Sequence, residues 1–105
     1  MMNAIEKIAP QSLGGNYHAR VDSYNLNNQR TFEVHVYRKQ GTKLIEQGIW
    51  NADGSFKPKH DIKVAPNLPI DVRNQLKGIM ISELRKLDQL PAKDYSNIKS
   101  FQTEV

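Results

Sequence analysis

The segment from Thr31 to Trp50, TFEVHVYRKQGTKLIEQGIW, predicts a β-hairpin whose two faces differ in chemistry. Apolar and polar side chains alternate along Thr31–Arg38, which is typical of a strand with one buried face. Gln40-Gly41 offers a two-residue turn, because glycine accepts a positive φ angle. We expect Lys43–Trp50 to return antiparallel to the first strand.

The register of this hairpin decides which side chains meet across it. If residues 39 and 42 flank the turn, His35 lies opposite Glu46 and Val36 lies opposite Ile45. The polar face then carries an acid–base pair, and the other face is apolar. We therefore expect one face to serve the core and the other to be open for function.

A second strand is predicted before the hairpin, at Asn16–Tyr24 (NYHARVDSY), because its side chains alternate in the same way. Asn25–Arg30 is rich in turn residues, and we place the centre of the loop between Asn27 and Asn28. A shift of one residue would turn each apolar set to the wrong face, which argues against other registers. The predicted cross-strand pairs are Tyr24 with Thr31, Asp22 with Glu33, Arg20 with His35, and His18 with Tyr37.

The rest of the chain supplies covering elements. Ile70–Leu87 has the apolar spacing of an amphipathic helix, with Pro69 at its first turn and acidic and basic residues at the ends that suit the helix dipole. The other expected elements are one or two helical turns at Met2–Ala9, a turn at Gln11–Gly15, a short edge strand at Ser55–His60 after the Asp53-Gly54 turn, and an extended connection at Asp61–Pro69.

These elements predict an α+β fold: an antiparallel sheet of three to four strands with one main C-terminal helix packed on one face and a short N-terminal helical segment. We expect a single domain over residues 1–105, with its core at about residues 16–90 and a tail at 91–105. The side chains expected beneath the helix are Val21, Phe32, Val34, Val36, Ile45, Ile49 and Phe56.

The amino-acid composition limits the classes of protein to which this chain can belong. The chain has 15 Lys and Arg against 11 Asp and Glu, a net charge of +4 and a pI near 9.4, which is compatible with a polyanionic partner. It contains no cysteine, so disulfides and thiolate metal sites are excluded. No stretch approaches the roughly 20 apolar residues of a membrane span, and Met1–Pro10 lacks the apolar region of a secretory signal. We expect no membrane partner.

The predicted registers place Arg20, His35 and Glu46 side by side across three strands, where directly opposed Cβ atoms are about 4.5–5.5 Å apart. These residue types suit metal-free RNA cleavage. Glu46 or His35 takes a proton from a ribose 2′-hydroxyl, His35 or His18 protonates the leaving oxygen, and Arg20 stabilises the transition state. The expected substrate-binding residues are Tyr37 and Trp50 for base stacking and Lys57 and Lys59 for phosphates, with Gly48 leaving room beside them.

Other interpretations of this polar face compete with catalysis. Charged and aromatic side chains are common on any solvated sheet face, where cross-strand ion pairs stabilise the sheet. A metal site of His18, His35 and Glu46 has suitable ligands but no diagnostic spacing, and no glycine-rich phosphate loop or serine-hydrolase motif is present. We therefore expect neither a cofactor nor a metal.

The segment HARVDSYNLNNQRTFEVHVYRKQGTKLIEQGIWNADGSFKPKHD, followed by NLPIDVRNQLKG, resembles C-terminal toxin domains of bacterial polymorphic toxin systems of the contact-dependent, Rhs and LXG types. Many such domains are similar to the barnase/EndoU/colicin/RelE superfamily, which cleaves RNA without metal on an open sheet face. The resemblance implies catalytic roles for His18, Arg20, His35 and Glu46. It also implies a cytoplasmic site of action after delivery from a secreted parent protein, and an acidic cognate immunity protein.

The sequence thus predicts a metal-independent endoribonuclease toxin acting on tRNA, rRNA or mRNA. The alternative is a non-catalytic module of a phage or mobile element that binds nucleic acid or protein through its basic surface and aromatic residues.

Overall fold

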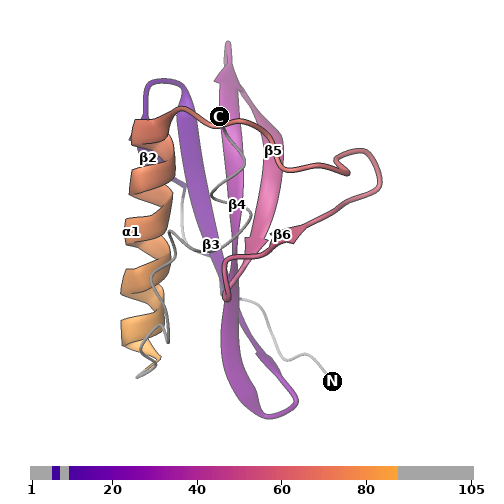
Figure 1. Cartoon of the computed structure of the whole chain (residues 1–105), viewed down its shortest axis with the longest axis vertical. Coiled ribbons are helices and arrows are strands. Elements are labelled where there is room, and N and C mark those ends of the chain that lie inside the picture. The colour runs from indigo at the N-terminus through magenta and orange to yellow at the C-terminus, as the bar shows by residue number, and fades with distance from the viewer. Residues whose placement is uncertain (1–5, 8–9, 88–105) are drawn as a thin grey trace.

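The computed structural model describes residues 6–7 and 10–87, which form one antiparallel sheet and one helix (Figure 1). The α+β class is confirmed, but this part of the chain contains six strands rather than three or four. The sheet order is β1-β3-β4-β5-β6, and β2 also pairs with β3. The elements are β1 (Glu6–Lys7), β2 (Gln11–Gly14), β3 (Tyr17–Leu26), β4 (Gln29–Gln40), β5 (Lys43–Asn51), β6 (Phe56–Lys57) and α1 (Ile70–Lys86).

The β3–β4 hairpin has the predicted register throughout. Asn27 and Asn28 form the turn with φ angles of 52° and 65°, a conformation that asparagine tolerates better than most residues. The short turn lets both strands extend to Leu26 and Gln29, further than the pattern indicated. The four predicted cross-strand pairs are all present: Tyr24 with Thr31, Asp22 with Glu33, Arg20 with His35, and His18 with Tyr37.

The β4–β5 register differs from the prediction in two ways. The two turn residues are Gly41 and Thr42, one position later in the chain than the predicted Gln40-Gly41, and Gly41 has a φ angle of 62°. Gln40 therefore pairs with Lys43. A β-bulge then leaves Gln47 without an opposite residue. The later turn, which precedes the bulge, places Glu46 opposite Tyr37 and not His35.

The bulge also reverses the faces of the last residues of β5. Gly48 and Trp50 lie opposite Val36 and Val34 on the core face, and Trp50 is only 1% exposed. Ile49 lies opposite His35, on the other face. The placement of Trp50 on the polar face and of Ile49 on the face beneath the helix was therefore wrong, although Ile49 is only 4% exposed. Ile45, near the hairpin turn, was also expected beneath the helix but is 40% exposed.

The N-terminal elements are strands in place of the predicted helix and turn. Glu6 and Lys7 pair with Ser23 and Asp22, and β2 pairs with the preceding part of β3. A helix of two turns is marginal in isolation, whereas the edge of β3 offers unpaired backbone N–H and C=O groups. Leu13 in β2 is fully buried, so this segment belongs to the core. Residues 2–5 and 8–9 of the predicted helix lie outside the described residues.

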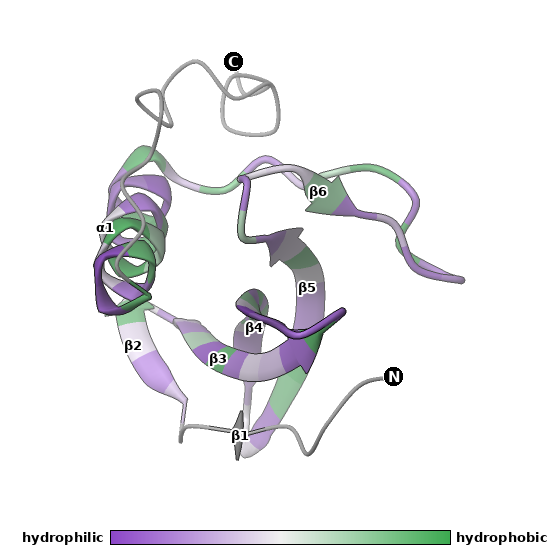
Figure 2. Ribbon diagram, turned by 90° about the horizontal axis from the view of Figure 1, so that it is seen from below, coloured by the Kyte–Doolittle hydropathy of each residue, from purple (hydrophilic) through white to green (hydrophobic). Residues whose placement is uncertain are grey.

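The helix α1 begins and ends within one residue of the prediction and covers the apolar sheet face. It packs beside β2, as Figure 1 shows, and Figure 2 shows apolar residues where α1 faces the sheet. Arg85 and Lys86 lie in its last turn, where cations suit the dipole. The predicted tail at residues 91–105 lies outside the described ranges. The core consists of Leu13, Ala19, Val21, Phe32, Val34, Val36, Trp50, Leu68, Val72, Leu76, Met80 and Leu84.

No helix in the described ranges is long and apolar enough to cross a membrane.

Candidate functional site

The candidate site lies on the sheet face opposite the core, and its centre is the imidazole of His35. The Nδ1 atom of His35 lies 2.6 Å from Oε2 of Glu46. The Nε2 atom lies 3.1 Å from Oε1 of Glu33 and 3.2 Å from Oδ2 of Asp22. Only 12% of the His35 side chain is exposed. Three carboxylates thus surround one partly buried imidazole.

Alternation along β3 and β4 brings three of these groups together. Asp22 and Glu33 are cross-strand partners on the face that carries His35, and Glu33 is two residues from His35 along β4. Glu46 reaches the ring diagonally from its place opposite Tyr37. The predicted contact between His35 and Glu46 is therefore present although the predicted pairing is not.

Arg20 adds a fixed cation to the site. It is the cross-strand partner of His35, and its Nε and Nη2 atoms lie 2.8 and 2.9 Å from the two oxygens of Asp22. This two-point contact fixes the guanidinium plane more strongly than a single ion pair would. The guanidinium also lies over the Tyr37 ring, 5.7 Å from its centroid, and the ring of Tyr37 is stacked at 14° to that of His35.

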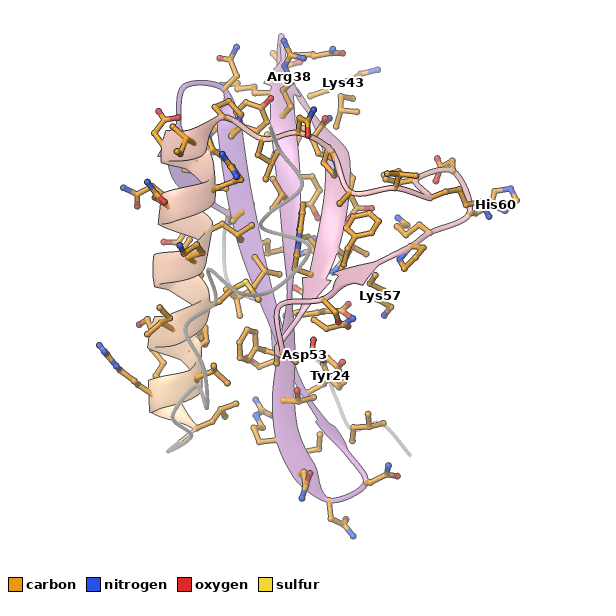
Figure 3. All side chains as sticks on the ribbon, in the orientation of Figure 1. Tyr24, Arg38, Lys43, Asp53, Lys57 and His60 are labelled. Atoms are coloured by element: carbon orange, nitrogen blue, oxygen red, sulfur yellow. The ribbon has the colours of Figure 1, made fainter. Side chains whose placement is uncertain are left out.

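Two lysines lie at the edge of the cluster: Lys57 in β6 and Lys59 just after it. Lys57 Nζ lies 3.0 Å from Oε2 of Glu33, and Lys59 forms an ion pair with Oε1 of Glu46. Their side chains are 49% and 40% exposed, so water screens both contacts. Figure 3 shows Lys57 and His60 on the side of the sheet away from α1. The predicted phosphate-binding lysines therefore belong to the same cluster as the predicted catalytic residues.

The charges of the cluster shift its pKa values together. Burial alone would lower the pKa of His35, but hydrogen bonds to Glu33 and Glu46 and the charge of Asp22 outweigh burial and raise it. The hydrogen bond from His35, helped by Lys57, lowers the pKa of Glu33 to about 2. Burial opposes the ionisation of Glu46, yet Lys59 and His35 lower its pKa. The ion pairs thus favour the imidazolium and the ionised carboxylates.

Two predicted site residues have other surroundings. Trp50 packs edge-on against Phe56 in the core, with 5.3 Å between ring centroids, so it offers no surface for a base. Gly48 leaves room for these two rings rather than for a ligand, since a Cβ there would lie 2.8 Å from Phe56 Cε1. Both corrections follow from the bulge in β5.

His18 lies on the site face, opposite Tyr37 and two residues from Arg20. Its Nδ1 atom is buried and has no hydrogen-bond partner among the described residues. It does not join the contacts of His35, so the structure places it beside the cluster rather than in it.

Asp22 and Glu33 were not among the predicted site residues, although the correct register placed them opposite one another on this face. Cross-strand pairing shows which residues are neighbours, but it does not show that the carboxylates of Asp22 and Glu33 turn toward the His35 ring. With His35 they form the group in the described part of the chain that could hold a metal ion, whereas the metal site considered from the sequence, at His18, His35 and Glu46, does not assemble.

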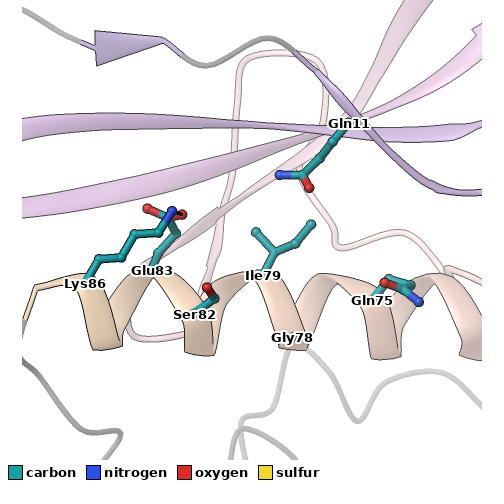
Figure 4. A pocket seen from close by; sticks show the side chains of 7 residues that line it. All are labelled: Gln11, Gln75, Gly78, Ile79, Ser82, Glu83 and Lys86. Carbon is teal, nitrogen blue, oxygen red and sulfur yellow. Dashed lines mark hydrogen bonds and ion pairs between the residues drawn. The ribbon is translucent and has the colours of Figure 1, made fainter.

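A separate groove of about 260 Å³ lies between β2 and α1 (Figure 4). An ion pair between Glu83 and Lys86 lies at one end of it. It is on the helix side of the sheet and shares no residue with the His35 cluster. Its lining residues are Gln11, Gln75, Gly78, Ile79, Ser82, Glu83 and Lys86.

Comparisons with protein-family models, with curated proteins and with solved structures found no match for this chain. The resemblance to polymorphic toxin domains therefore stays a prediction from sequence.

Proposed function

We propose that this protein is a metal-independent endoribonuclease that cleaves RNA through attack of a ribose 2′-hydroxyl on the adjacent phosphate. One observation carries the proposal: Arg20, His35 and Glu46 gather on the open sheet face, with His35 hydrogen-bonded to Glu46 and directly opposite Arg20. A carboxylate, an imidazole and a fixed guanidinium are the groups that such a reaction needs to move protons and stabilise phosphoryl charge.

Glu46 is the general base in this proposal. Its lowered pKa keeps it ionised at neutral pH, and the imidazole of His35 fixes the orientation of its carboxylate. It accepts the proton of the 2′-hydroxyl while that oxygen forms a bond to phosphorus. Lys59 occupies its other oxygen, but this exposed side chain is free to turn toward a substrate phosphate.

His18 is the general acid, because both ring nitrogens of His35 already face carboxylates. His18, Tyr37 and Glu46 form one row across β3, β4 and β5, so acid and base come from the two strands that flank Tyr37. A proton from His18 passes to the 5′-oxygen as its bond to phosphorus breaks. The products are a 2′,3′-cyclic phosphate and a free 5′-hydroxyl.

Arg20 stabilises the negative charge that develops on the phosphoryl oxygens. Asp22 engages its Nε and Nη2 atoms and so leaves Nη1 for the substrate. Tyr37 lies beneath this guanidinium and supplies a flat surface beside the scissile phosphate.

The test is cleavage of a fluorescent RNA by the full chain in EDTA, with mass spectrometry of the product ends. We expect cyclic phosphate ends, and a loss of about 100-fold or more in rate for Glu46→Gln and His18→Ala. Glu83→Gln is the matched control, since it removes a carboxylate in an ion pair on α1. Full cleavage by a triple variant with alanine at 20, 35 and 46 would refute the site.

A second substrate distinguishes the role of the general acid, His18, from that of the general base, Glu46. An aryl ester of a nucleoside 3′-phosphate carries a leaving group that needs no proton. With this ester His18→Ala should approach the wild-type rate, while Glu46→Gln stays slow. Equal defects on both substrates would contradict the assignment of His18 as the acid.

A nucleic-acid-binding module without catalysis would give a different pattern. RNA would be retained but not cut, and charge reversal at Lys57 and Lys59 would abolish retention with a steep dependence on salt. That result would replace the ribonuclease proposal with the binding function.

A further inference from the structure

We propose that Asp22, Glu33 and His35 form a binding site for one divalent first-row transition-metal ion such as Zn²⁺. One ligand atom of each residue lies within 4.8 Å of those of the other two. The atoms belong to adjacent positions of β3 and β4, so the sheet ladder fixes their spacing. This site goes beyond the proposed ribonuclease, which uses no metal.

The distances fit an ion between the three atoms. His35 Nε2 lies 3.1 Å from Oε1 of Glu33 and 3.2 Å from Oδ2 of Asp22. An ion about 2.1 Å from a nitrogen and an oxygen, with ligand angles of about 90–110°, sets those two atoms about 3.0–3.4 Å apart. The two separations from His35 therefore suit metal ligands, and the two carboxylate oxygens lie within 4.8 Å of one another.

A proton on Nε2 of His35 fits the space between these three atoms less well than a metal ion does. Nε2 faces two carboxylate oxygens, and a proton on it would have to be shared between them. Both distances exceed the roughly 2.7–2.9 Å of a strong charge-assisted hydrogen bond. The Nδ1 contact to Glu46, at 2.6 Å, is short by comparison. The Nε2 side of the ring thus has room for a metal ion in place of this shared proton.

Each ligand also has the outer partner that metal ligands usually have. Histidine ligands commonly donate the other ring N–H to a carboxylate, and ligating carboxylates are themselves hydrogen-bonded. Glu46 accepts from Nδ1 of His35, Arg20 holds Asp22, and Lys57 holds Oε2 of Glu33. Because Lys57 takes Oε2, the Oε1 atom remains directed toward the ion position.

Burial and charge are compatible with this ion. The side chains of Asp22, Glu33 and His35 are 5%, 14% and 12% exposed, so little water competes for the ligand atoms. The two carboxylate ligands offset the two charges of the ion. One imidazole and two carboxylates suit Zn²⁺, Co²⁺ or Mn²⁺ better than Ca²⁺ or Mg²⁺, which prefer oxygen ligands alone.

The experiment titrates untagged, metal-free protein with Co²⁺, followed by visible absorption, and with Zn²⁺, followed by calorimetry. We expect one ion per chain. Glu33→Gln and His35→Gln should abolish binding, and Glu46→Gln should weaken it by about 10–100-fold because it removes an outer partner. His60→Gln is the control for an exposed histidine elsewhere and should bind as the wild type does.

Absence of a Co²⁺ spectrum at millimolar metal would overturn the inference, as would wild-type affinity in His35→Gln. If these variants fail to fold, long-range ¹H–¹⁵N spectra of the wild-type protein decide the matter. Zn²⁺ must then shift the ring signals of His35, and a shift confined to His18 or His60 refutes the site. No readout involves RNA, so failure of this inference and failure of the ribonuclease proposal are separately visible.

Discussion

Replacing Gly48 by alanine tests the reversal of faces in β5. A Cβ at this position would lie 2.8 Å from Cε1 of Phe56 and 3.0 and 3.1 Å from Cζ3 and Cη2 of Trp50. Carbon atoms pack best at about 3.5–4.0 Å, so the Phe56 ring must move by roughly 0.7 Å. That ring packs edge-on against Trp50, and because Trp50 is buried in the core, the indole cannot turn away into solvent.

Overpacking of this kind costs about 1–3 kcal/mol, and alanine returns about 0.5–1 kcal/mol over glycine in a strand. The difference runs from about 0 to 2.5 kcal/mol, so we expect Gly48→Ala to lower the free energy of unfolding by about 1 kcal/mol. Gly78→Ala is the control of opposite sign, because its Cβ meets nothing within 4 Å and alanine is favoured in a helix interior by about 1 kcal/mol. Urea unfolding measures both variants. A Gly48→Ala protein more stable than the wild type, as Gly78→Ala should be, would refute the packing of these rings.

Three further predictions concern the core and the acid stability of the cluster. Trp50 is the single tryptophan and is buried, so native fluorescence should be blue-shifted and resistant to acrylamide; emission like that of free indole would contradict its burial. Leu13→Ala should cost about 2–5 kcal/mol in urea unfolding if β2 is part of the core, and below 1 kcal/mol if residues 11–15 were a surface turn. Glu33 has a pKa lowered to about 2 from 4.5, so the stability that it contributes is present above pH 4.5 and is lost as the pH falls toward 2. The difference in unfolding free energy between wild type and Glu33→Gln should therefore shrink over that range, and a constant difference would contradict the shift.

The sequence was sufficient for the β3–β4 hairpin and for α1. Alternation on both strands and the Asn27-Asn28 turn allow one register, because any slip by one residue buries Arg20 or His35. The helix is equally determined, since Val72, Leu76 and Met80 follow one stripe after Pro69. The row that contains Arg20 and His35 could be predicted for this reason alone.

The N-terminal strands could not be read from local sequence. Met2–Ala9 and Gln11–Gly15 have no alternation long enough to indicate a strand, and the glycines suggest a turn. Their structure depends on pairing with the free edge of β3, which is separate from them along the chain but adjacent in the fold. Tertiary pairing of this kind overrides weak local preference.

The bulge in β5 decides whether the site and the core can coexist on one strand. Glu46 and Trp50 are four residues apart, and in an unbroken strand residues at even spacing share a face. Either Glu46 would enter the core or Trp50 would leave it. Inserting Gln47 as an unpaired residue changes the parity, so the carboxylate meets His35 while the indole packs behind Val34. The sequence pattern alone cannot show this bulge. Glu46 indicates the polar face of the sheet, but a tryptophan such as Trp50 is compatible with either face. The chemistry proposed for the open face therefore rests on a local irregularity and not on the regular alternation that first pointed to it.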